Sequence, residues 1–269
     1  MNCASRGVPA ALLALAAFAQ EPSAKGVNFY SLEREIQLGQ QTAGGLERTL
    51  PAVHDAKLEG YIAGLGSELA RYAGQQFVYR FTFYDDRKPP VVPGVALALP
   101  ADAFQGQAAE PVAIAGGPIF VPLSLLANAP SEAEFAFQLA HAMAHVALRH
   151  ATKLATRNEL ARVAGALLND MPANQQFAVP LGLLNFARQC ELQADILAAD
   201  IVAGAGYDPA AAISVAPDNA TASRVFSAHP TREQRAAAIK ARIEKLPPRE
   251  YSAATGQFAG MKALAAVAR

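Results

Sequence analysis

The hydrophobic period of this sequence changes twice, and that pattern limits the possible folds more than any other feature. Apolar residues recur at three- and four-residue steps from Leu58 to Tyr72, which predicts an amphipathic helix over roughly residues 51–72. Residues 77–84 then alternate with a period of two, which predicts a strand. The helical period returns from Ser131 onward. The pattern therefore predicts an α+β fold that is mainly helical with a small β-sheet.

Glycines and capping residues divide these segments. Gly116 and Gly117 separate two short apolar runs, 112–115 and 119–121, which predicts a β-hairpin. Ser31 is a candidate N-cap for a helix over about residues 32–42 that ends near Gly44. Further caps predict four later helices. These caps are Ser131 with Glu134, Thr156 with Glu159, Asp208 before Pro209, and Thr231 with Gln234. A further long helix is expected over residues 181–203.

The N-terminus has the pattern of a secretory signal peptide. Arg6 precedes an apolar run over residues 9–18, and a small-x-small signal at 17–19 ends before Gln20. We expect residues 1–19 to be removed, leaving a single exported domain over residues 20–269, in the periplasm or outside the cell. No later run is long and apolar enough to predict a membrane span. The 23 basic and 23 acidic residues balance, so the charge gives no reason to expect a nucleic acid partner.

Two histidines lie four residues apart in the predicted helix that Ser131 begins. In an α-helix, residues four apart lie on one face, so His141 and His145 can bind one metal ion together. The alternative is an accidental pair of surface or half-buried histidines. Glu191 and Asp195 follow on the predicted helix over residues 181–203, again one turn apart. Two imidazoles and one carboxylate form the ligand set of a catalytic zinc, although charged residues on a helix are more often a solvated face.

Several motifs in this order resemble zinc metallopeptidase family forty-eight, a gluzincin family that includes bacterial heat-shock proteases and CAAX prenyl proteases. The resemblance covers roughly residues 30–245 and is carried by "EPVAIAGGPIFVPLSLL", "LAHAMAHVALRH", "ELQAD", "AGYDP" and "SAHPTREQR". It implies a gluzincin-like domain that binds one zinc ion and acts on peptides or unfolded proteins. The implied zinc ligands are His141, His145 and Glu191. The other implied site residues are Asp195 behind the ligands, His229 and Arg235 near the metal, and Val112, Ala113 and Ile114 on a strand that a peptide substrate would extend.

The sequence departs from the family at the position of the general base. The resemblance places a glutamate, the general base, where this chain has Ala142. Alanine has no titratable group, so we expect a protein that binds zinc in the cell envelope but hydrolyses peptides weakly or not at all. The alternative is a non-catalytic module of the same fold that binds peptides or acts as a chaperone. Either a natural loss or an introduced substitution would give alanine here.

Three other residues are given structural interpretations. His150 lies five positions after His145, about 140° around a continuous helix, so we expect it to be structural or exposed and not a ligand. His54 is expected to be structural, on the helix predicted over residues 51–72. Cys190 is expected to be a buried and inert thiol. Glu132 and Glu134 lie about 10 to 15 Å along the helix from the histidines, too far to replace the missing base.

Overall fold

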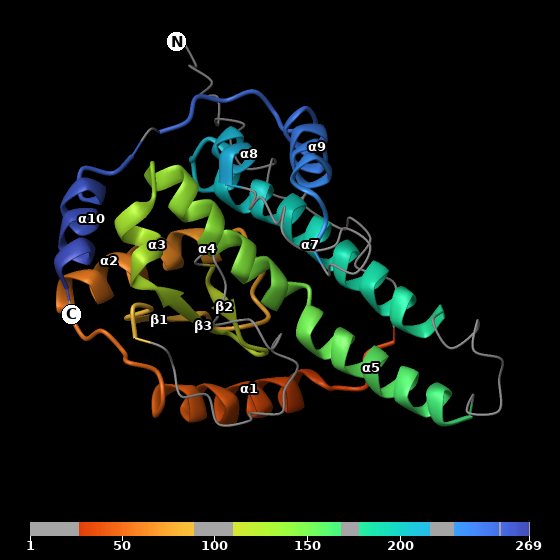
Figure 1. Cartoon of the computed structure of the whole chain (residues 1–269). Helices are drawn as coiled ribbons and strands as arrows, with labels where there is room; N and C mark the ends of the chain where they lie inside the picture. Colours follow the sequence, from red (N-terminus) through yellow and green to blue (C-terminus); the bar gives the residue numbers. More distant parts are fainter. Residues whose placement is uncertain (1–26, 89–109, 168–177, 216–228, 253, 269) are drawn as a thin grey trace, which may run out of the picture.

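The computed structural model describes residues 27–88, 110–167, 178–215, 229–252 and 254–268. Most of these residues are helical, and a single small sheet lies near the centre of the molecule (Figure 1). The prediction of a mainly helical α+β fold is therefore confirmed. The elements in chain order are α1 (Leu32–Glu47), α2 (Ala56–Ala70), β1 (Arg80–Tyr84), β2 (Val112–Ala113), β3 (Pro118–Pro122), α3 (Leu123–Asn128), α4 (Glu132–Ala147), α5 (His150–Leu167), α7 (Ala178–Gly204), η1 (Pro209–Ala211), α8 (Ala212–Val215), α9 (Arg232–Ile243) and α10 (Phe258–Val267).

The sheet has the strand order β1-β3-β2, with β1 parallel and β2 antiparallel to β3. The predicted hairpin is confirmed, and its two glycines have positive φ angles of 82° at Gly116 and 128° at Gly117. A Cβ atom on Gly117 would also lie 2.2 Å from the carbonyl oxygen of Val78, so a side chain there would clash. The glycines therefore allow both the turn and the close approach of the neighbouring backbone.

The strand that was predicted over residues 77–84 is shorter and is buried on both faces at its end. It begins at Arg80, and both Phe83 and Tyr84 are buried. Phe83 belongs to the main hydrophobic cluster, whereas Tyr84 packs in a second cluster with Leu46 of α1. Because helices cover both faces of the sheet, strict alternation of apolar and polar residues is lost there.

Helix α4 occupies the centre of the molecule, between the sheet and α7 (Figure 1). Almost all of its residues are buried, and many of them are alanines. Small side chains on both helices are completely buried, among them Ala140 and Ala144 on α4 and Ala194 and Ala198 on α7. Such side chains let two helices pack closely, so residues on facing sides of α4 and α7 can share one site.

Most of the predicted helices are present, but several predicted boundaries were wrong. Helix α1 continues through Gly44 and Gly45 to Glu47, and α2 begins only at Ala56, where the Asp55 side chain accepts hydrogen bonds from two backbone N–H groups. The segment before α2 instead lies alongside β1, because the Val53 N–H donates to the Phe83 carbonyl oxygen. The capping pair Thr231 and Gln234 is present in full at the start of α9.

The expected cap at Thr156 is wrong. Helix α5 already begins at His150, so Thr156 lies inside it, and its Oγ1 accepts a hydrogen bond from the backbone N–H of Phe29. Helix α4 ends at Ala147, and Arg149 then takes a left-handed conformation with φ 59°. The chain therefore turns sharply between α4 and α5, and the assumption of one continuous helix through His150 was wrong as well.

Among the described residues, no helix has both the length and the apolar character needed to cross a membrane. The predicted signal peptide over residues 1–19 lies outside the described residues. Its removal and the single domain over residues 20–269 stay predictions.

Candidate metal centre

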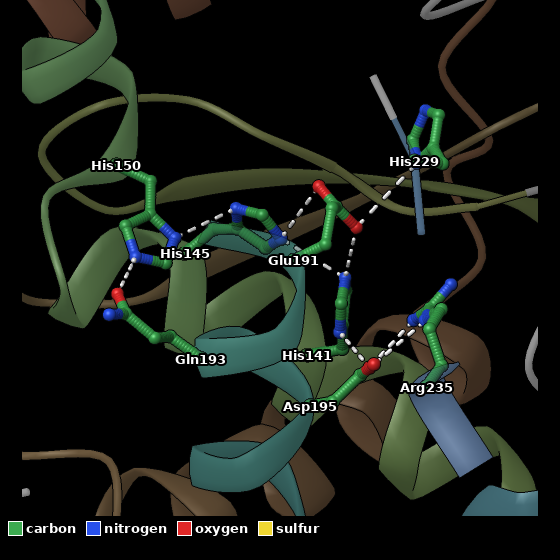
Figure 2. A network of polar contacts seen from close by, with 8 residues as sticks. All are labelled: His141, His145, His150, Glu191, Gln193, Asp195, His229 and Arg235. Carbon is green, nitrogen blue, oxygen red and sulfur yellow. Dashed lines mark hydrogen bonds and ion pairs between the residues drawn. The ribbon is translucent and has the colours of Figure 1, made fainter. Parts of the chain in front are cut away.

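The two histidines of α4 and the glutamate of α7 point at one another (Figure 2). One ligand atom from each of His141, His145 and Glu191 can be chosen so that all three lie within 4.8 Å of one another. The Nε2 atoms of the two histidines are 3.0 Å apart, and each lies 3.5 Å from an oxygen of Glu191. The structure therefore brings together the three residues that the sequence predicted as metal ligands.

The spacing of these atoms fits a zinc ion. Zinc binds imidazole nitrogen and carboxylate oxygen at about 2.0 to 2.2 Å, which puts the ligand atoms of a tetrahedral site about 3.4 Å apart. The two histidine nitrogens are 3.0 Å apart, and each lies 3.5 Å from a different oxygen of Glu191, Oε2 for His141 and Oε1 for His145, so these separations lie close to that value. Two nitrogen lone pairs that face each other also repel unless a proton or a cation lies between them. The donor set and its geometry can therefore hold the zinc that the resemblance implies.

Asp195 and Arg235 support His141, the first candidate ligand, on the side away from Glu191. The Nδ1 atom of His141 lies 3.0 Å from Oδ1 of Asp195. The Arg235 guanidinium donates to both oxygens of the same carboxylate, from Nε at 2.8 Å and from Nη2 at 2.6 Å. All three side chains are buried. Arg235 thus holds Asp195, which in turn lies against the ring nitrogen of His141 that points away from the ligand cluster.

His150 lies against the second ligand, in a position that the sequence did not predict. The turn at Arg149 brings it back over His145, so that the two Nδ1 atoms are 3.2 Å apart. Its Nε2 lies 3.3 Å from Oε1 of Gln193 on α7. His150 is buried and outside the group of three candidate ligands, so the structural interpretation is correct for a reason that helical spacing did not reveal.

His229 lies at the side of the cluster, and the charge of Glu110 acts on it. The Nδ1 atom of His229 is 3.7 Å from Oε2 of Glu191, and its side chain is 33% exposed. Glu110, just before β2, is close enough to act electrostatically on His229 and Arg235, and this acidic residue was missed in the sequence. A contact with Glu191 raises the pKa of His229, against the opposing effect of burial. His229 therefore approaches the cluster through Glu191.

Burial and charge act in opposite directions on the ligands. Burial lowers the pKa of His141, but the carboxylates of Asp195 and Glu191 outweigh it and raise the value to about 9. Burial dominates at His145 and lowers its pKa to about 4. Burial would raise the pKa of Glu191, yet the surrounding histidines hold it well below its usual range. These pKa shifts favour a proton on His141 and a neutral imidazole at His145. A metal ion that bound to both Nε2 atoms would replace that proton.

Ala142 lies between the two histidines and is 2% exposed, as a member of the main hydrophobic cluster. The Glu132 carboxylate on the same helix does not replace a base at this position. Glu132 is buried and accepts hydrogen bonds from Tyr61 Oη at 2.8 Å and from Thr255 Oγ1 at 2.7 Å, as well as one from the Thr255 N–H. Its oxygens therefore join the C-terminal segment to α2, away from the histidines.

The predicted substrate strand lies at the edge of the sheet. Strand β2 pairs with β3 on one side, and it packs against α4. Val112 and Ile114 belong to the second hydrophobic cluster, whereas Ala113 packs against the main one. Since these side chains are taken up by the interior, an added peptide would contact this segment mainly through its backbone.

Two further residues are placed by the structure. Cys190 is a buried free thiol, and burial raises its pKa to about 12, as expected for an inert thiol. His54 is not on α2, where it was expected. It lies two residues before that helix with an 80% exposed side chain, next to Glu59.

Comparisons with known proteins agree with this site. The model of Peptidase family M48 matches residues 101–243, more than half of the chain, and this match includes every candidate site residue. A protein from Vibrio cholerae serotype O1, named "Putative beta-barrel assembly-enhancing protease", is 26% identical over 240 residues. The alignment covers 81% of this chain but 46% of that protein, so the chain spans less than half the length of this relative. With the family match over this constellation of histidines and glutamate, the chain belongs to Peptidase family M48.

Proposed function

We propose that this metallopeptidase-type domain holds one zinc ion through His141, His145 and Glu191, and that the loss of a base at Ala142 impairs its hydrolysis. The observation that carries the proposal is the convergence of three ligand atoms within 4.8 Å around a helix whose intervening residue is a buried alanine. The family supports a zinc-dependent peptidase chemistry. The residue at position 142 supports the impairment.

A zinc ion bound there would polarise a peptide carbonyl and lower the pKa of a bound water. Glu191 and the two histidines would supply its ligands, and Asp195 would orient His141 through Nδ1 at 3.0 Å. Arg235 acts through Asp195, because its Nε and Nη2 atoms are bound to that carboxylate. We therefore assign Arg235 a positioning role. We assign His229, whose Nδ1 is 3.7 Å from Glu191 Oε2, a place beside the reacting peptide.

The missing step is proton transfer from the attacking water to the leaving amine. General acid–base catalysis contributes about 10² to 10⁴ in rate, equal to roughly 3 to 5.5 kcal/mol of barrier. The methyl group of Ala142 neither accepts nor donates a proton, and Glu132 is engaged with Tyr61 and Thr255. Slow hydrolysis assisted by metal alone is the expected residual activity.

For the substrate, we propose an extended peptide or an unfolded protein that lies along the backbone of residues 112–114. The edge position of β2 beside α4 supports this placement, and so does the peptidase family. We further propose action in the cell envelope, supported by the signal-like pattern over residues 1–19. Sequencing the N-terminus of the mature protein after expression with its leader tests the export, and an intact Met1 would contradict it.

The decisive experiment compares the chain as given with Ala142→Glu and with Ala142→Gln, which has nearly the same volume but no base. Zinc content is measured for all three proteins, together with cleavage of unfolded casein. We expect about one zinc per chain in each, and a rate about 10² to 10⁴ higher only in Ala142→Glu. Thermal melting shows whether the longer side chain is tolerated in this buried position.

Three outcomes would contradict parts of this proposal. Zinc far below one ion per chain, or zinc that persists after His145→Ala, would reject the metal site. Hydrolysis by the chain as given at the Ala142→Glu rate would reject the impairment, and Glu110→Gln would then test whether Glu110 is the base. Zinc and peptide binding without cleavage in Ala142→Glu would favour the non-catalytic peptide-binding module.

A further inference from the structure

The ring nitrogen of His145 that points away from the ligand cluster is in contact with a second histidine. Its Nδ1 atom lies 3.2 Å from Nδ1 of His150, and the two ring planes are 80° apart with centroids separated by 4.9 Å. His150 is 4% exposed, and its other nitrogen lies 3.3 Å from Oε1 of Gln193 (Figure 2). Three side chains thus form a continuous row that ends at the ligand atom of His145.

The proton positions along this row follow from the ligand cluster. The Nε2 atom of His145 faces His141 and Glu191, so it must present a lone pair to a bound cation. A neutral imidazole has one N–H, which must then be on Nδ1 and donate to Nδ1 of His150. His150 consequently carries its own N–H on Nε2 and donates it to the carbonyl oxygen of Gln193. Each group then has the donor or acceptor that its neighbour needs.

We propose that His150 and Gln193 are positioning residues, which fix the tautomer and the ring orientation of His145 so that its Nε2 binds the metal ion. The inference rests on the proposed zinc site and adds to it two residues outside the ligand set. Ligand histidines generally donate their other N–H to a carboxylate, a carbonyl or water. Here the acceptor is the lone pair of a second imidazole.

Hydrogen bonds to the residues on either side of His150 hold the backbone there and orient its ring toward His145. The Arg149 side chain, at the left-handed turn, donates from Nε to Glu35 Oε2 at 2.6 Å and from Nη2 to the Tyr30 carbonyl oxygen at 2.7 Å. Thr152 donates to the same Glu35 oxygen at 2.9 Å, and Glu35 is completely buried. Helix α1 thus fixes both sides of the first turn of α5, from which His150 reaches His145.

The test measures zinc affinity of the folded full chain, by titration against a chromophoric chelator. His150→Leu removes the acceptor and keeps an apolar side chain of similar size, so we expect a 10- to 100-fold weaker zinc Kd. His150→Asn can still place an oxygen toward His145, and we expect it to restore the Kd to within a few-fold. Gln193→Leu leaves the His145 to His150 contact in place, so a smaller loss of about 3- to 10-fold is expected.

His54→Leu is the matched control, since it makes the same substitution at an 80% exposed histidine outside the cluster. It should leave zinc affinity unchanged. The visible spectrum of the cobalt-loaded protein reports ligand geometry independently of activity, and we expect it to change in His150→Leu but not in His54→Leu. Urea unfolding of each metal-free protein separates loss of fold from loss of metal binding. If His150→Leu fails to fold, Gln193→Leu and His150→Asn decide the question.

A wild-type zinc Kd in both His150→Leu and Gln193→Leu would overturn this inference while leaving the proposed zinc site intact. Failure of the unmodified chain to bind zinc would instead reject the proposed function itself. A loss in His150→Leu that His150→Asn does not restore would also reject the positioning role, because the acceptor would then not be what matters.

Discussion

The two histidines of the candidate metal site are one helical turn apart, yet the protein supports them by opposite means. Behind His141 stands an ion pair, with Asp195 bound through both oxygens by the buried Arg235. Behind His145 stands a neutral row, from His150 to Gln193, that contains no formal charge. A buried ion pair is costly to break, because the partner that is left behind remains charged in the interior. A neutral row depends mainly on where its protons lie, so its loss should affect metal affinity more than stability.

The largest effect is expected on the charged side. Asp195→Ala removes the carboxylate that binds the 3% exposed Arg235 through both oxygens, and should lower the free energy of unfolding of the metal-free protein by about 3 to 5 kcal/mol. Urea unfolding in the presence of a chelator measures it. The control is Asp200→Ala on the same helix, whose partner Arg242 is more exposed. We expect less than half the loss there, and equal losses would mean that burial of the pair is unimportant.

Removal of the proposed zinc ion should affect both sides together. A ligand that binds only the folded state adds about 2.7 kcal/mol when its free concentration is 100 times Kd. Thermal melting with and without a chelator should therefore differ clearly at saturating zinc. His145→Ala serves as the control, and its melting temperature should not respond to the chelator. A chelator effect of equal size in that variant would place the stabilising metal elsewhere.

Arg235→Lys tests the geometry of the charged side while keeping its charge. A lysine has no planar fork, so one of the two hydrogen bonds to Asp195 is lost. We expect the free energy of unfolding to fall by about 1.5 kcal/mol, the value of one hydrogen bond to a charged group. Urea unfolding of the metal-free variant checks this, and a loss as large as in Asp195→Ala would indicate that the lysine cannot reach the carboxylate.

The smallest change in stability is expected on the neutral side. Gln193 is half-buried and uncharged, so Gln193→Leu should lower the free energy of unfolding of the metal-free protein by no more than about 1 kcal/mol. Zinc affinity should fall nonetheless, in contrast to its small effect on stability. Urea unfolding of metal-free Gln193→Leu, in parallel with Asp195→Ala, measures the change in stability. A loss as large as that of Asp195→Ala would remove the distinction between the two sides.

Local patterns in the sequence were sufficient for much of this site. The spacing of His141 and His145 follows from the 3.6-residue period of a helix, and the same holds for Glu191 and Asp195 on α7. The Ser131 and Thr231 side chains cap their helices as predicted. Family motifs extended this to the full set of candidate ligands. Each of these features depends on residues that are close in the sequence, or on motifs with a fixed order.

Other features were missed because they depend on turns and packing between distant segments. The contact from Arg235 to Asp195 spans 40 residues, and that from His150 to Gln193 spans 43. The parallel pairing of β1 with β3 joins strands separated by a Pro-rich stretch. Thr156 was predicted as a cap, but its hydroxyl accepts from Phe29 on a segment far away in the sequence. No local pattern encodes these partners.

The sequence by itself determined the helical histidine pair, the carboxylates one turn apart and the absence of a base at Ala142, because helix geometry and residue chemistry are local. Only the tertiary structure decided how these helices meet. The close packing of α4 against α7 brings Glu191 within 3.5 Å of both histidines. The left-handed turn at Arg149, held by the buried Glu35, brings His150 to His145. That turn is stabilised by contacts more than 100 residues away in the chain, which helical periodicity cannot express.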